Sequence, residues 1–172
     1  MNQFQQLWWE QAHSDHKIFS ILRNASVPEC YPLHFLQMTT EKLSKAYFFR
    51  LSSPTKKTHS AFRNFLLRLG DVPESHRNRV ALLFRFGRFD GFQTWLKDNV
   101  TLAYQLQNLA PALAGDGPNP EYPWPHAAPF EVPARFKFPF WSCLRDTAKG
   151  RRFLQFINIA VETFPEYCRV DR

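Results

Sequence analysis

The sequence has few of the residues that hold a small secreted or metal-bound fold together. It contains three cysteines, Cys30, Cys143 and Cys168, which are far apart and include no CxxC pair. This number and spacing argue against a disulfide framework or a zinc site and favour a reducing compartment. The six glycines are dispersed, so no glycine-rich phosphate loop is present.

Long apolar runs are also missing. The longest stretch without a charged residue, 99–115, has 17 residues and includes several polar side chains, which makes it too polar for a membrane span. The first residues lack the basic and apolar segments of a secretory signal. We therefore expect a cytoplasmic protein with no membrane association.

What is present suits one globular domain. The chain has 172 residues, 44% of them hydrophobic and 22% charged. This length and composition are enough for one hydrophobic core, so we expect a single domain over residues 1–172. Phenylalanine accounts for 18 of the aromatic residues. Because phenylalanine has no polar group, most of these rings are expected in a core or an interface.

The positive charge is concentrated in one part of the chain. The net charge is +7. Residues 50–88 hold nine Lys and Arg against two acids, and the remaining residues hold 13 of each, so this stretch carries the whole excess. An excess of this size indicates either an acidic partner or a contribution to solubility alone, and its concentration in one stretch is the more informative feature.

Apolar residues recur at spacings of three and four, which predicts helices. The expected helices cover roughly Phe4–Arg23, Pro32–Leu51, Thr58–Leu69, Pro73–Arg85, Phe92–Ala110 and Lys149–Phe164. No alternating strand pattern competes with them. The predicted fold class is all-α, an up-and-down antiparallel helical bundle.

One segment interrupts this pattern before the last helix. Residues 111–139 hold eight of the 13 prolines, which excludes a persistent helix or a central strand. The segment also carries five aromatic residues, Tyr122, Trp124, Phe130, Phe136 and Phe138. We expect an extended connection that lies against the bundle.

Asp15 lies in the apolar stripe of the first helix. A carboxylate in such a stripe needs a partner, and Lys42 or Lys45 of the second helix is suited to provide one. A buried ion pair is the favoured interpretation, and the border of a ligand pocket is the alternative. Glu41 and Lys45 form a favourable pair one helical turn apart.

Two of these helices resemble the HEPN domain family. The resemblance covers roughly residues 5–69 and becomes loose beyond them. It rests on the first helix (Trp8, Ala12, Asp15, Phe19, Leu22), on the second (Phe35, Gln37, Glu41, Lys42, Leu43, Lys45, Ala46), on Lys57, Thr58 and His59, and on the NPEYPW run at 119–124. The resemblance implies a helical bundle, frequent homodimers, and roles in RNA cleavage, nucleotide binding or pairing with a nucleotidyltransferase.

The family's ribonucleases carry an arginine, four to six residues and then a histidine. This chain does not match that motif, because seven residues separate Arg68 from His76 and eight separate Arg50 from His59. Gly70 and Pro73 further interrupt the first of these intervals. We therefore expect binding rather than the family's catalysis. If there is proton transfer, His59 and His76 are the candidates, although helix-end histidines more often cap a helix or lie at the surface.

The basic stretch supplies the candidate contact residues for nucleic acid. The set is Lys56, Lys57, Arg63, Arg68, Arg77 and Arg79. Arg63 also lies between Phe62 and Phe65, as in sites that bind single strands. The periodicity by itself favours the other interpretation, in which these rings are core residues and the cations form a solvated face.

No metal or cofactor is expected. His13 and His16 lie one turn apart near Glu10 and Asp15, but two histidines without a third convincing ligand are typical of surface residues. The function favoured by these observations is a homodimeric, non-catalytic protein that binds RNA or another nucleic acid, a nucleotide or a partner protein. The alternatives are a metal-independent ribonuclease toxin with an irregular Arg/His site, and a homodimeric interaction scaffold.

Overall fold

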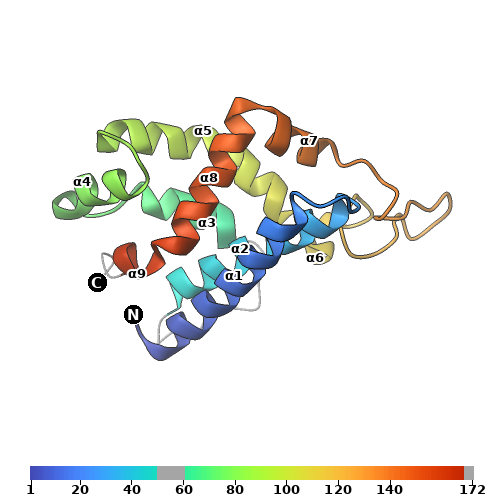
Figure 1. The fold of residues 1–172 in the computed structure, drawn as a ribbon, viewed down its shortest axis with the longest axis horizontal. Helices are drawn as coiled ribbons and strands as arrows, with labels where there is room; N and C mark the ends of the chain where they lie inside the picture. The colour runs from blue at the N-terminus through green and yellow to red at the C-terminus, as the bar shows by residue number, and fades with distance from the viewer. Residues whose placement is uncertain (50–60, 169–172) are drawn as a thin grey trace.

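The protein is all-α over the residues that the structure, a computed structural model, describes: 1–49 and 61–168. Nine helices and no strand occur in these two ranges (Figure 1). The helices are α1 (Gln3–Leu22), α2 (Cys30–Phe48), α3 (Ala61–Leu69), α4 (Glu74–Leu83), α5 (Phe89–Gln107), α6 (Pro111–Ala114), α7 (Pro139–Asp146), α8 (Ala148–Glu162) and α9 (Phe164–Tyr167). None of the described helices is long and apolar enough to cross a membrane.

The first two helices form a pair. Asn2 caps α1 reciprocally with Gln5, which satisfies backbone N–H groups that the first turn leaves without a helical partner. Phe4 stacks on Phe49, at the far end of α2, with 5.0 Å between the ring centroids. The Lys42 ammonium lies 2.5 Å from the Asp15 carboxylate nearer the middle. Contacts in this order show that α1 and α2 run in opposite directions.

The same arrangement joins α3 to α5. The Arg63 backbone N–H, near the start of α3, donates to the side-chain oxygen of Gln107 at the end of α5. The Gln93 amide, in the first half of α5, donates to the carbonyl of Gly70 just after α3. These two helices are therefore also antiparallel, and α2 packs against α3 on another side.

An aromatic core joins these pairs to the end of the chain. Phe84 contacts Phe92, Phe156 and Tyr167 with ring centroids 4.9–5.5 Å apart. The Tyr167 hydroxyl donates to the carbonyl of Ala160, and burial raises its pKa well above the ordinary value. Much of the phenylalanine content therefore fills one core, as its apolar character predicts.

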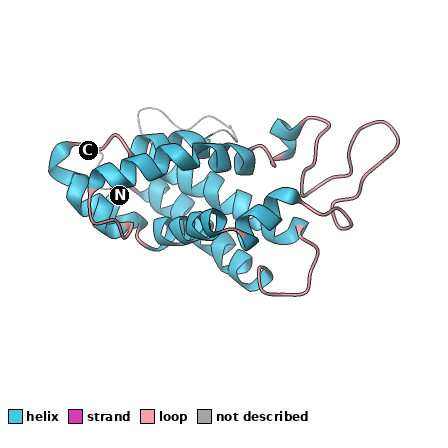
Figure 2. Cartoon of the chain, turned by 90° about the horizontal axis from the view of Figure 1, so that it is seen from above, coloured by secondary structure: helices cyan, strands magenta, loops and turns pink. Residues whose placement is uncertain are grey.

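The proline-rich segment differs from its expected form. It is not extended throughout, because Pro111 opens the short helix α6 and Pro139 opens α7, each at a first-turn position where the missing N–H costs nothing. We expected the segment to lie against the bundle. Trp124 and Phe138 are buried, whereas Tyr122 and Phe130 are each 61% exposed. Figures 1 and 2 show its loops extending beyond the helices.

Candidate nucleic-acid interface

The described part of the basic stretch is arginine-rich and exposed. Three residues predicted from the sequence, Lys56, Lys57 and His59, lie outside the described residues. Of the predicted contact set, Arg63 and Arg68 lie on α3, and Arg77 and Arg79 lie on α4. All four are exposed, as are Arg85 and Arg88 in the connection between α4 and α5. The structure therefore places six arginine side chains at the surface within 26 consecutive residues, 63–88.

These arginines extend along α5 rather than around one point. The backbone of Arg63 is bonded to Gln107, the last residue of α5. The guanidinium of Arg77 lies 5.5 Å from the ring centroid of Phe89, the first residue of α5. At roughly 1.5 Å per residue, about 27 Å of helix separates these two attachment points. The four described residues of the predicted contact set, Arg63, Arg68, Arg77 and Arg79, therefore form a row and not a single cleft.

His76 lies at the start of this row, in the first turn of α4, next to Arg77. Its ring is partly buried, and its backbone N–H donates to the carbonyl of Pro73. Within the described ranges, its side chain has no hydrogen bond or ion pair. Nothing among these residues orients the imidazole as a general base requires.

The connection between α4 and α5 gathers cations and rings at one end of the row. Arg85 has a φ of 62°, a left-handed conformation that is uncommon for a residue with a Cβ atom. Phe86 then turns back, and its N–H donates to the carbonyl of Ala81. Arg88 and Phe89 follow and begin α5. We call Arg77, Arg85, Phe86, Arg88, Phe89 and Arg152 the arginine–phenylalanine cluster.

Arg152 of α8 completes the cluster from a distant part of the chain. Its guanidinium lies 4.9 Å from the ring centroid of Phe86. One of its nitrogens is 3.5 Å from the carbonyl oxygen of Arg85, and another donates to Gln155 at 2.8 Å. A cation over a ring face is attracted by the ring's quadrupole. Arg152 therefore supports the strained turn and adds a positive charge to it.

Phe86 also belongs to a partly exposed aromatic surface. Its ring centroid lies 5.2 Å from that of Phe92 and 5.8 Å from that of Trp95. Trp95 in turn packs on Phe156 at 5.0 Å. Phe86 and Trp95 are only partly buried, so the core reaches the surface next to the arginines. Cations beside exposed rings are the two components of sites that bind single-stranded nucleic acid.

Few acids offset this positive charge. Arg68 pairs with Asp71 at 3.0 Å, and Arg88 lies 3.4 Å from Asp90 with both side chains more than 80% exposed. Exposed pairs of this kind are weak and are screened by salt. Arg63, Arg79 and Arg85 have no ion pair with any described residue. The row therefore keeps a positive field that favours polyanions.

Arg85 and Arg88 belong to the basic stretch but not to the contact set predicted from the sequence, and that set includes neither Arg152 nor Phe86. The signal that was available is the run Arg-Phe-Gly-Arg-Phe at 85–89, in which cations and rings alternate. Arg152 had no such signal, because only the packing of α8 brings it to this turn.

The buried charged residues of α1 and α2 form ion pairs within the fold. Asp15 pairs with Lys42, one of its two predicted partners, and both side chains are largely buried. Lys45 pairs with Glu41, as predicted, and its ammonium lies 5.1 Å from the Trp8 ring centroid. Each buried charge thus has an opposite charge beside it, which the low dielectric requires.

The two histidines of α1 are not the surface pair that their spacing suggested. His16 is 4% exposed, and burial is the main cause of its lowered pKa. His13 is partly exposed and lies 3.5 Å from Glu162 of α8. No group of three or more potential metal-ligating side chains occurs among the described residues.

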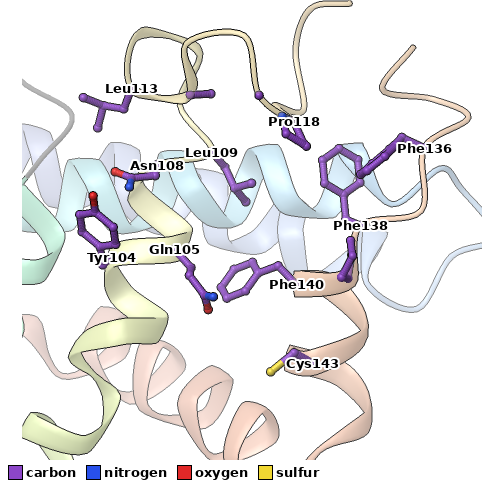
Figure 3. A pocket seen from close by; sticks show the side chains of 13 residues that line it. Tyr104, Gln105, Asn108, Leu109, Leu113, Pro118, Phe136, Phe138, Phe140 and Cys143 are labelled. Atoms are coloured by element: carbon purple, nitrogen blue, oxygen red, sulfur yellow. The ribbon is translucent and has the colours of Figure 1, made fainter. Parts of the chain in front are cut away.

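A separate cavity of about 590 Å³ lies between the end of α5, α6 and the start of α7 (Figure 3). Its wall is mainly apolar, with Leu109, Phe138 and Phe140 among the lining residues. Tyr104 and Gln105 of α5 and the residue that follows this helix, Asn108, supply polar side chains, and none of the lining residues is Lys, Arg, Asp or Glu. This cavity therefore lacks the cations that a phosphate group needs.

Comparison with known proteins adds nothing to this geometry, since neither a family model, nor a curated protein, nor a solved structure matches the chain.

Proposed function

We propose that this chain is a non-catalytic protein that binds single-stranded nucleic acid, RNA in the first instance, along the arginine row of α3 and α4. The arginine–phenylalanine cluster, at one end of the row, is the main part of the contact. The observation that carries the proposal is the group of cations at the partly exposed ring of Phe86: Arg152 lies over the ring, and the exposed Arg85 and Arg88 precede and follow it in the same turn. Phosphates meet the cations, and bases stack on rings.

The spread of the row supports a strand rather than a mononucleotide. A nucleotide requires cations that converge on one phosphate group, whereas these arginines follow about 27 Å of α5, measured at roughly 1.5 Å per residue. Neighbouring phosphates of a strand are spaced along such a path. A short single strand is therefore the ligand that fits the charge distribution best.

We also propose that the chain has the helical-bundle fold of the HEPN domain family. The order of the described helices and the antiparallel pairs α1–α2 and α3–α5 support an up-and-down bundle of the HEPN type. A nucleotidyltransferase partner is a further expectation from that resemblance. The arrangement of His76, without a side-chain partner among the described residues, supports binding without catalysis.

The test is RNA binding as a function of salt. We expect the wild-type chain to bind a fluorescent single-stranded RNA, with log K falling linearly with log salt concentration. The variant Arg85→Gln/Arg88→Gln removes two cations from the cluster. The slope should fall by about 1.4, because each phosphate contact on a single strand contributes ~0.7.

The matched control removes the same charge elsewhere. Arg135→Gln/Lys137→Gln changes two exposed cations of the proline-rich segment, far along the chain from the cluster. It should bind as the wild type does. Wild-type binding that is absent or insensitive to salt contradicts the proposal, and so does an equal loss in both double variants.

The binding assay also tests the ribonuclease alternative. We expect the labelled RNA to remain intact after prolonged incubation with purified protein. Cleavage that His76→Ala abolishes, with circular dichroism unchanged, establishes the catalytic alternative instead.

A further inference from the structure

The outer face of α1 carries apolar side chains that the fold leaves partly exposed, including Phe4, which stacks on Phe49 with one part of its ring. Phe4 is 49% exposed, Leu7 53%, Ile18 37% and Ile21 70%. Gln11 and Ser14 lie between these two pairs and are also exposed. The six residues follow one another at alternating spacings of three and four, which is the a/d spacing of a two-helix seam. We call them the α1 seam.

The other faces of α1 pack against the rest of the chain, so the position of the α1 seam is fixed by these contacts. Ala12 and Phe19 are buried, and Asp15 pairs with Lys42 of α2. The Trp9 indole N–H donates to the carbonyl of Val161 in α8 at 2.8 Å. With α2 and α8 on these sides, the seam points away from the chain's own core. Exposed apolar residues gathered on one face of a helix in that position indicate a protein interface.

The α1 seam is complementary to itself. From either end, it has two apolar residues, then two polar ones, then two apolar ones. An antiparallel second copy of α1 therefore places Phe4 against Ile21, Leu7 against Ile18, and Gln11 against Ser14. A two-fold axis through the middle of the seam repeats each of these three contacts, as the isologous interface of a symmetric dimer requires.

Charge on the flank of the seam selects the same orientation. Glu10 and Lys17 each precede a seam residue by one position, so both lie on one flank of α1, and both are exposed. Antiparallel pairing brings Glu10 of one copy beside the other copy's Lys17, and symmetry repeats the pair. Parallel pairing does not bring Glu10 and Lys17 together, because both then face the opposite flank of the second helix. Opposite charges across the seam thus favour only the antiparallel form.

We propose that two copies of this chain associate through the α1 seam, with the two α1 helices antiparallel about a two-fold axis. The surface is remote from the arginine–phenylalanine cluster. In Figure 1, α1 lies along the lower edge of the molecule and α4 at its upper left. Association therefore leaves the proposed nucleic-acid surface of each copy uncovered.

The experiment measures solution mass by sedimentation equilibrium over a range of protein concentrations. The wild-type chain should form a dimer, and Leu7→Glu/Ile18→Glu should be monomeric. Leu82→Glu is the matched control, because Leu82 of α4 is 66% exposed and lies outside the seam. This control should dimerise as the wild type does. Circular dichroism establishes that all variants remain folded.

A charge exchange tests the orientation independently of the apolar contacts. Glu10→Lys alone and Lys17→Glu alone each create two like-charge contacts across the axis and should weaken the dimer severalfold. Glu10→Lys/Lys17→Glu restores opposite charges and should recover the wild-type dissociation constant. A wild-type chain that stays monomeric overturns the proposal. A Leu7→Glu/Ile18→Glu chain that still dimerises also overturns the proposal. So does a double charge variant that dimerises more weakly than both single charge variants.

Discussion

Arg85 occupies a backbone conformation that its side chain does not favour. Its φ of 62° costs about 1–2 kcal/mol for a residue with a Cβ atom. Glycine at this position avoids that cost. The sequence nevertheless has arginine here, with glycine two positions later. Strained residues persist where their side chains serve a function, and the proposed contact with nucleic acid gives Arg85 such a function.

Arg85→Gly should therefore lower the affinity for RNA without lowering the stability of the fold. The variant relieves the strained φ, which outweighs the added freedom of glycine in the unfolded chain, estimated at about 0.4–1 kcal/mol. We expect the free energy of unfolding in urea to remain at the wild-type value or to rise by up to about 1 kcal/mol. RNA affinity should fall because one cation is lost.

Arg88→Gly is the comparison, because Arg88 has an extended backbone with a φ of −141°. Glycine relieves no strain there, and the variant should be less stable than Arg85→Gly by about 1 kcal/mol. Equal unfolding free energies for the two variants would show that the Arg85 backbone stores no strain.

Sequence reasoning at the residue scale succeeded where the partner is set by helical spacing. Lys45 lies one turn from Glu41, so their pairing follows from the α-helix itself. Asp15 and Lys42 are on different helices, yet an acid in an apolar stripe needs a cation, and few were available. His16 was misjudged because its burial against neighbouring helices depends on packing that local spacing does not specify.

At the scale of elements, the sequence predicted the six longest of the described helices and missed the three shortest, α6, α7 and α9. Where both lie within the described residues, predicted and observed ends differ by a few residues, because helix ends depend on caps and on the following chain; the predicted end at Leu51 and the predicted start at Thr58 lie outside the described residues. Helix α7 was missed, since it follows a proline-rich segment and its eight residues are too few to show a period. The row of arginines likewise needed tertiary contacts, because the antiparallel packing of α3 on α5 determines where each one lies.

The corner between α7 and α8 depends on a glycine. A Cβ atom on Gly150 would lie 2.2 Å from the carbonyl oxygen of Cys143 and 2.5 Å from the Cα atom of Leu144. Both are backbone atoms that cannot move away alone. Thr147 caps α8 by accepting from the Gly150 N–H, so the same turn holds both helices.

Gly150→Ala should therefore destabilise the fold. Forcing extra volume into a packed site costs about 1–3 kcal/mol, and contact with backbone places this variant at the upper end. Urea unfolding measures the loss. Gly91→Ala in α5 is the control, because no atom lies within 4 Å of its added Cβ. It should stabilise the chain by about 1 kcal/mol, since alanine favours a helix. A Gly150→Ala chain as stable as the wild type contradicts this account of the corner.

At the scale of the whole molecule, the two proposed surfaces lie on different elements and have different chemistry. The α1 seam is apolar with one flanking pair of charges, and the arginine row is positive with partly exposed rings. A dimer formed through the seam carries two arginine rows related by the two-fold axis. Such a dimer is bivalent toward any strand long enough to reach both rows.

Bivalence predicts that dimerisation matters only for long ligands. A strand that reaches both rows binds the second row at a high effective concentration, which should raise its affinity by about 10²-fold over a strand confined to one row. Leu7→Glu/Ile18→Glu should remove this gain and leave the affinity for a short strand unchanged, since it alters no residue of the row. Fluorescence anisotropy with single-stranded RNAs of increasing length measures both quantities. If the monomeric variant also binds the short strand more weakly, the α1 seam and the arginine row are not independent. If this variant retains the higher affinity for long strands, one copy of the chain binds the long strand by itself and bivalence is contradicted.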